Sequence, residues 1–199
     1  MTPTAAVYVD VGSPFAYLAA ERVDEVFAGA EIDWRPVSLG ALFKLTGRSS
    51  WALGDPERRR TGMAEVERRA ALRGLPPLRW PDPWPGNYLM AMRAATHADR
   101  LGRGRDFLVQ ALRDAFQQGR DLSLSTHVLE SAEQIGLDAA EVERACADPD
   151  VKHALRERTD AAHELGVFGV PTVAVDGELF WGDDRLEDAA ALLRAMPKP

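Results

Sequence analysis

Residues 7–16 read Val-Tyr-Val-Asp-Val-Gly-Ser-Pro-Phe-Ala, and this segment is the most informative about the fold. Its first half is rich in β-branched and aromatic side chains, which predicts a buried strand. Ser13 is a good helix N-cap, and Pro14 suits the first helical position because its missing N–H would have no partner there. A helix is therefore expected over about 14–28, followed by an alternating strand over 31–37. Two strands joined through a helix lie parallel to each other.

The middle of the chain has helical patterns. Helices are predicted over 57–73, 88–101, 105–118, 126–135, 139–147 and 149–165. The apolar stripe of the first is expected to be Met63, Val66, Ala70 and Leu72. The expected N-caps of the last three are Ser125, Asp138 and Asp148. A proline-rich loop over 76–85 separates the first two helices, because proline removes hydrogen-bond donors and restricts the residue before it.

Strand patterns return near the C-terminus. Residues 172–175 and 178–181 are predicted strands, and Asp176-Gly177 between them is a strong hairpin turn. A last helix is predicted over 185–196. The two halves then form one four-stranded mixed sheet, since two separate domains would each leave an open sheet edge. This α/β layout is that of a thioredoxin-like domain, formed by residues 1–38 and 166–199, with a large all-helical insertion over 39–165.

The composition argues against several classes of protein. The 199 residues include 24 Lys and Arg and 31 Asp and Glu, so the formal net charge is −7. Nucleic-acid and anionic-membrane binding need an excess of basic residues and are not expected. No apolar run reaches the ~18–20 residues of a membrane span, and the N-terminus lacks the pattern of a signal peptide, so a cytoplasmic protein is expected. Cys146 is the only cysteine, which excludes an internal disulfide and a cysteine-based zinc site, and no metal is expected.

The junction between the first strand and the first helix is a candidate for chemistry. The N-terminus of a helix has unpaired N–H groups and a partial positive charge, so it stabilises an anion. Thioredoxin-like folds place a reactive Cys-x-x-Cys pair here, and this chain has Ser13 and Ala16 at the two cysteine positions. The site therefore lacks the sulfur for dithiol–disulfide exchange. It suits a thiolate supplied by a ligand, unless Ser13 serves only as a helix cap.

Two further segments can contribute to a ligand site. Pro171 enters a strand directly after a helix, which is awkward for a β-ladder. In thioredoxin-like folds the bond at Val170-Pro171 is cis and leaves the preceding backbone free to pair with an extended peptide such as glutathione; a plain loop proline is the alternative. Asp183 and Asp184 lie at the start of the last predicted helix, where a carboxylate either caps the helix or receives a ligand ammonium group.

Four segments of the chain together resemble one group of proteins. They are residues 8–18, 35–40, 166–171 and 180–186. On these segments the chain resembles the glutathione-dependent 2-hydroxychromene-2-carboxylate isomerases and the kappa-class glutathione transferases, within the DsbA-like group. The four segments occur in order along the full chain, and the helical middle matches more loosely.

The resemblance implies a thiol-dependent isomerase of aromatic-compound catabolism. Ser13 would stabilise the thiolate of bound glutathione, and Val170 would pair with the glutathione backbone beside a cis Pro171. The γ-glutamyl end would be held by Trp181, Gly182, Asp183 and Asp184. In such isomerases the thiolate adds to the unsaturated ring, the ring opens, one bond rotates, and elimination returns glutathione unchanged. Glutathione would then be a cofactor.

The resemblance also implies which residues meet the substrate, a small aromatic carboxylate. Lys44 matches a family lysine that faces the substrate carboxylate, although a solvated surface lysine fits the pattern equally. Arg48 stands where the family tends to have Asn, and its guanidinium is suited to a carboxylate. Asn87 and Tyr88 are expected to line the same side of the cleft.

Several alternatives remain open from the sequence. A kappa-like transferase would leave glutathione on the product, and a non-catalytic thiol-binding or partner-binding module would lack turnover altogether. In each of these alternatives another low-molecular-weight thiol can take the place of glutathione. Members of the family are commonly dimers, so a homodimer is expected. Trp80 and Trp84 either cover the cleft or anchor the proline-rich loop.

Overall fold

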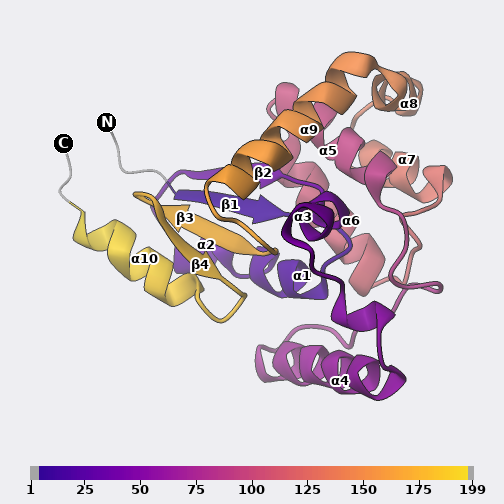
Figure 1. Ribbon diagram of the computed structural model, residues 1–199. Coiled ribbons are helices and arrows are strands. Elements are labelled where there is room, and N and C mark those ends of the chain that lie inside the picture. Colours follow the sequence, from indigo (N-terminus) through magenta and orange to yellow (C-terminus); the bar gives the residue numbers. More distant parts are fainter. Residues whose placement is uncertain (1–4, 197–199) are drawn as a thin grey trace.

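A computed structural model describes residues 5–196, and its centre is one mixed β-sheet (Figure 1). The strands are β1 (Ala5–Val9), β2 (Ile32–Pro36), β3 (Thr172–Val175) and β4 (Glu178–Trp181). They follow the order β2-β1-β3-β4. β1 is parallel to β2 and antiparallel to β3, and β3 is antiparallel to β4. The predicted four-stranded mixed sheet of a thioredoxin-like fold is therefore confirmed.

The first strand and the first helix differ from the prediction at their ends. β1 ends at Val9 rather than at residue 11, because the N–H of Ser13 donates to the carbonyl of Asp10 and closes a turn. The single helix expected over 14–28 is wrong: α1 (Pro14–Ala20) and α2 (Val23–Val26) are separate. Arg22 lies between them, and its guanidinium donates to the carbonyl of Asp183, which fixes the break against the loop before the last helix.

The seven helices predicted between residues 57 and 196 are found with ends within two residues of the prediction, and two short helices over 39–46 and 51–53 were not predicted. They are α3 (Leu39–Thr46), the short 3-10 helix η1 (Trp51–Leu53), α4 (Pro56–Leu72), α5 (Leu89–Arg100), α6 (Gly104–Phe116), α7 (Ser125–Gln134), α8 (Ala139–Ala147), α9 (Pro149–Glu164) and α10 (Leu186–Ala195). Asp138 and Asp148 are N-caps as predicted. Ser125 is not, because α7 begins one residue earlier than expected and Leu124 takes the cap position.

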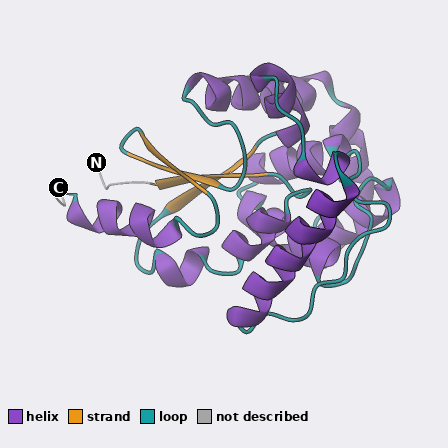
Figure 2. Ribbon diagram, turned by 60° about the horizontal axis from the view of Figure 1, so that its bottom comes forward, coloured by secondary structure: helices purple, strands orange, loops and turns teal. Residues whose placement is uncertain are grey.

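The two faces of the sheet pack against different helices (Figure 2). Val7 and Val9 belong to the main core, which includes residues of α1, α5, α6 and α10. Ala6 and Tyr8 point to the opposite face and join a smaller cluster with Leu42 of α3 and Ala162 of α9. This alternation is the expected pattern for a strand that is covered on both faces.

The core is continuous between the sheet and the helical block. Trp34 of β2 and Phe107 of α6 belong to the same buried cluster. The division into a domain of residues 1–38 with 166–199 and an insertion of 39–165 stays a prediction, and its ends at 1–4 and 197–199 lie outside the described residues. One predicted core residue is wrong: Leu72, at the last turn of α4, is 73% exposed.

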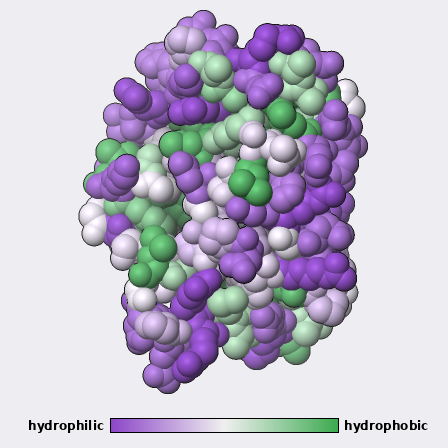
Figure 3. Space-filling model, turned by 90° about the vertical axis from the view of Figure 1, so that its right-hand side faces the viewer, coloured by the Kyte–Doolittle hydropathy of each residue, from purple (hydrophilic) through white to green (hydrophobic). Residues whose placement is uncertain are grey.

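The outer surface is mixed in character. On the side that carries the helical block, hydrophobic residues occur in small groups among hydrophilic ones (Figure 3). Within residues 5–196, no helix is both long and apolar enough to span a membrane.

Candidate functional site

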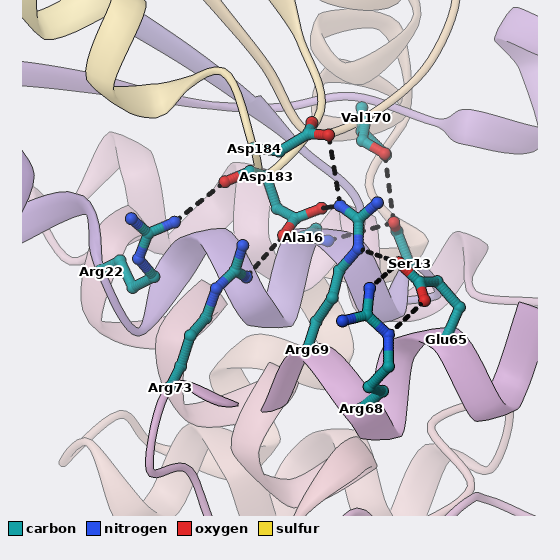
Figure 4. A network of polar contacts seen from close by, with 10 residues as sticks. All are labelled: Ser13, Ala16, Arg22, Glu65, Arg68, Arg69, Arg73, Val170, Asp183 and Asp184. Atoms are coloured by element: carbon teal, nitrogen blue, oxygen red, sulfur yellow. Dashed lines mark hydrogen bonds and ion pairs between the residues drawn. The ribbon is translucent and has the colours of Figure 1, made fainter. Parts of the chain in front are cut away.

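Ser13 joins the start of α1 to the loop that precedes β3. Its Oγ accepts a hydrogen bond from the N–H of Ala16 at 3.2 Å and donates one to the carbonyl of Val170 at 3.2 Å (Figure 4). The side chain is buried, and the residue is 4% exposed. The peptide bond between Val170 and Pro171 is cis, as predicted. Both halves of the expected thiol site, the helix end and the cis-proline loop, are thus in contact.

The turn that presents Ser13 is held from several directions. The Asp10 carboxylate accepts a hydrogen bond from the N–H of Gly12 at 2.8 Å. The indole of Trp84 donates to the carbonyl of Gly12 at 3.2 Å. The ring of Tyr88 packs so closely on Gly12 that a Cβ at that position would lie 2.4 Å from a ring carbon. Only glycine fits there without moving the ring.

Asp10 is a buried acid that the sequence analysis did not single out. It is 4% exposed, and burial raises its pKa to about 6 although two backbone N–H groups lower it. The sequence feature that could have identified Asp10 is an aspartate at the end of an otherwise apolar predicted strand. A charged residue is seldom buried without a specific partner.

Asp183 lies in a cluster of arginines that come from α4, from the residue that follows α4, and from the segment between α1 and α2 (Figure 4). Its side chain is 1% exposed and pairs with Arg69 at 2.8 Å and with Arg73 at 2.5 Å. The neighbouring Asp184 has a side chain that is 58% exposed and lies 3.4 Å from Arg69. Arg69 also pairs with Glu65 on its own helix at 2.7 Å. Of the two carboxylates predicted to receive a ligand ammonium group, Asp184 is open to solvent and Asp183 is already paired.

Trp181 lies at the edge of this region. It is 53% exposed, and its ring packs on Phe168 with centroids 4.8 Å apart. The guanidinium of Arg48 lies over the ring of Phe168, 4.1 Å from its centroid. Gly182 follows Trp181 with a φ of +116°, a conformation that favours glycine.

A cavity of about 430 Å³ adjoins the turn before Ser13. Its walls come from the turn after β1, from α3, from η1 with the residue before it, and from the segment before α5. The lining residues are Asp10, Gly12, Ser38, Leu39, Gly40, Ala41, Phe43, Lys44, Ser50, Leu53, Pro85, Gly86, Asn87, Tyr88 and Leu89. Three of the four residues predicted to meet a substrate, Lys44, Asn87 and Tyr88, therefore share one cavity. Arg48 is not among the lining residues.

The tryptophans of the proline-rich region act as anchors. Trp84 is 4% exposed, and its ring packs against Trp80 and Trp51 with centroids 4.7 Å and 5.3 Å apart. The Trp80 indole donates to Glu67 of α4 at 2.7 Å. The alternative in which Trp84 covers the cleft is therefore not the arrangement found.

Cys146 lies within α8 and is not among the residues that line the cavity. The thiol is buried, and burial raises its pKa to about 11, which disfavours the reactive thiolate form. Over residues 5–196, the structure contains no group of three or more His, Cys, Asp and Glu side chains that could hold a metal ion.

Comparisons with known proteins agree with the resemblance seen in the sequence. The chain is 29% identical over 196 residues to the 2-hydroxychromene-2-carboxylate isomerase of Sphingobium xenophagum, which covers 94% of this chain and 96% of that protein. It is 38% identical over 85 residues to glutathione S-transferase kappa 1 of Homo sapiens, which covers 39% of this chain and 38% of the relative. A solved structure of a 2-hydroxychromene-2-carboxylate isomerase has the same fold, with a TM-score of 0.85, 23% identity, and coverage of 96% of this chain and 94% of that one. The family described as the DSBA-like thioredoxin domain matches residues 4–194, and the chain therefore belongs to this family.

Proposed function

We propose that the protein is a glutathione-dependent isomerase of 2-hydroxychromene-2-carboxylate type. The observation that carries this proposal is the position of Ser13, whose hydroxyl lies between the N-terminus of α1 and the carbonyl of Val170. A cavity with Lys44 in its wall begins beside this turn. The likeness to an isomerase over nearly the full chain supports the same proposal.

The residues present fit the polar groups of glutathione. Ser13 and the end of α1 suit its sulfur, because a hydroxyl donor and a positive helix end both favour a thiolate. The backbone N–H of Val170 has no hydrogen-bond partner among residues 5–196 and suits the peptide backbone of the ligand. The exposed Asp184 lies 3.4 Å from the partly buried Arg69, and these two opposite charges match the ammonium and carboxylate groups of a γ-glutamyl end.

We assign different roles to the two adjacent aspartates, Asp183 and Asp184. The Asp183 carboxylate is buried against Arg69 and Arg73, so we assign it to holding α4 in place. We assign Asp184 to the ligand ammonium group, with Trp181 and Gly182 shaping the surface beside it.

Glutathione, when bound, supplies a thiolate that adds reversibly to an electron-poor double bond. Ser13 donates a hydrogen bond to the sulfur in place of the one it donates to the carbonyl of Val170. This hydrogen bond lowers the pKa of the thiol, so the thiolate persists at neutral pH. Lys44 faces the substrate carboxylate as a point charge, and we assign this role to Lys44 rather than to Arg48 because only Lys44 lines the cavity. Asn87 and Tyr88 supply polar groups on the same wall and orient the ring.

A product assay tests this function. The purified protein is incubated with 2-hydroxychromene-2-carboxylate, with and without glutathione, and the ring-opened isomer and the free thiol are both measured. We expect isomer to form only with the thiol present, at constant free thiol. If neither glutathione nor any other low-molecular-weight thiol supports turnover, the proposal is wrong.

A kappa-like glutathione transferase is the second candidate. The 38% identity to a kappa-class transferase over 85 residues favours it. The same assay separates the two enzymes, because a transferase consumes one thiol for each product formed. A module that binds thiols without turnover would bind glutathione and leave every substrate unchanged.

A further inference from the structure

We propose that Asp10 is a positioning residue that holds the thiol-binding turn and the substrate-binding helix α3 in one fixed arrangement. This inference rests on the proposed function. It assigns a role to a buried carboxylate that touches both parts of the site and belongs to neither predicted set of ligand residues.

Two hydrogen bonds carry the argument. One carboxylate oxygen of Asp10 accepts from the N–H of Gly12 at 2.8 Å, and Gly12 directly precedes Ser13. The other oxygen accepts from the N–H of Leu39 at 2.7 Å, and Leu39 is the first residue of α3. Lys44 lies on the same helix and lines the cavity. One side chain therefore joins the segment that presents Ser13 to the helix that presents Lys44.

The sheet explains why Asp10 can reach both partners. β1 and β2 are parallel, and Val9 is paired with Pro36 at their ends. The segments that follow these two strands leave the sheet at the same end, so Asp10, the residue after Val9, lies beside the start of α3. The hydroxyl of Ser38 already caps α3 by accepting from the N–H of Ala41. The N–H of Leu39 would be left without a partner if Asp10 did not accept from it.

Backbone groups stabilise the charge of Asp10 in part. Burial raises its pKa to about 6, and the N–H groups of Gly12 and Leu39 act against this rise. The other titratable groups in the cavity wall are Lys44 and Tyr88. Protonation of Asp10 would place an O–H against one of the two N–H donors and break one of the links.

The sign of the effect on an anionic ligand separates positioning from simple electrostatics. A carboxylate in the cavity wall repels a carboxylate ligand, so removing its charge alone would tighten binding. Removing its role in positioning would weaken binding, because Lys44 and the turn would no longer be held together. The two explanations therefore predict changes in opposite directions.

The test uses chromone-2-carboxylate, a stable bicyclic carboxylate, and glutathione as separate probes in titration calorimetry. Asp10→Asn should raise the Kd of chromone-2-carboxylate about fivefold, the loss expected from one hydrogen bond, and should also raise the Kd of glutathione. The matched control is Asp33→Asn on β2, whose exposed carboxylate pairs with Arg35 and lies outside the cavity, and it should change neither Kd. With substrate, the Asp10 variant should raise KM and lower kcat together.

A pH titration of the parent protein needs no variant and covers the case in which Asp10→Asn does not fold. The Kd of chromone-2-carboxylate should rise as the pH falls through about 6, although the loss of a negative charge alone would lower it. An unchanged or lower Kd in Asp10→Asn, or tighter binding by the parent at low pH, overturns the inference. If the parent does not bind chromone-2-carboxylate, the proposed function fails. The role of Asp10 is then decided by the Kd of glutathione, which should rise in Asp10→Asn and stay unchanged in Asp33→Asn. A parent that binds neither probe overturns both.

Discussion

Replacing Asp183 by Asn removes the charge that holds α4 against the rest of the molecule. The carboxylate is 1% exposed and pairs with both Arg69 and Arg73. α4 also contacts η1 and α1, but its sequence is strongly polar, and only Val66 and Ala70 of this helix are buried. The ion cluster is therefore a major part of the attachment of this helix.

The structure sets the size of the expected loss. Breaking a buried ion pair by removing one partner costs about 3–5 kcal/mol, because the remaining charge stays buried without compensation. Here the two arginine side chains are 25% and 20% exposed, so water can solvate them in part, and Arg69 keeps its pair with Glu65. We therefore expect Asp183→Asn to lower the free energy of unfolding by about 2–3 kcal/mol.

Tryptophans that contact α4 contribute to the fluorescence of the protein. Trp51 packs against Gly62 of α4, and the Trp80 indole donates to Glu67 of the same helix. Urea denaturation is followed by fluorescence and by far-UV circular dichroism. In Asp183→Asn the fluorescence transition should occur at lower urea than the circular dichroism transition, because α4 leaves before the sheet unfolds.

The matched control is Arg68→Ala. Arg68 is one residue from Arg69 on α4, its side chain is 60% exposed, and Glu65 is its one ion-pair partner within residues 5–196. We expect no measurable change in either transition, since exposed ion pairs contribute little. Equal stability of Asp183→Asn and the parent, or an equal loss in the Arg68 variant, would refute the account of how α4 is held.

Three further predictions concern the site itself. Gly12→Ala should lower the free energy of unfolding by about 1–3 kcal/mol, measured by urea denaturation, because the new methyl group meets the ring of Tyr88; an unchanged stability would contradict the close packing. Lys44→Met should raise the KM for the aromatic carboxylate about tenfold, the loss expected when a charged hydrogen bond is removed, while the Kd of glutathione stays constant in calorimetry; a shift in both would argue against a role limited to the substrate. Cys146→Ala should keep full thiol-dependent turnover, and the parent should resist alkylation at neutral pH because the thiol has a pKa of about 11; rapid labelling would contradict this.

The sequence was sufficient for features that depend on neighbouring residues. Ser13 and Pro14 begin α1, and Asp148 with Pro149 begins α9, because caps and proline act within one turn of helix. The hairpin turn at residues 176–177 was equally local. β-branched and aromatic runs, with alternation in the second strand, predicted the strands, and the order of the elements along the chain predicted the mixed sheet.

The missed features depend on contacts between distant segments. The break between α1 and α2 is fixed by Arg22, whose partner Asp183 is 161 residues away. The pairing of Asp183 with Arg69 spans 114 residues, so the sequence showed only an acid near a helix start. The role of Asp10 depends on Leu39, which it meets only because two parallel strands end side by side. Local pattern carries no information on such pairs.

The pKa of bound glutathione tests the central claim, that Ser13 stabilises a thiolate supplied by a ligand. The ultraviolet absorbance of the thiolate is measured against pH for glutathione bound to the parent and to Ser13→Ala. A hydrogen bond to a charged group contributes about 1.5–3 kcal/mol, so the parent should hold the thiol pKa about 1–2 units below its value in Ser13→Ala. The same thiol pKa in both proteins, or a parent that binds no thiol, would contradict the account.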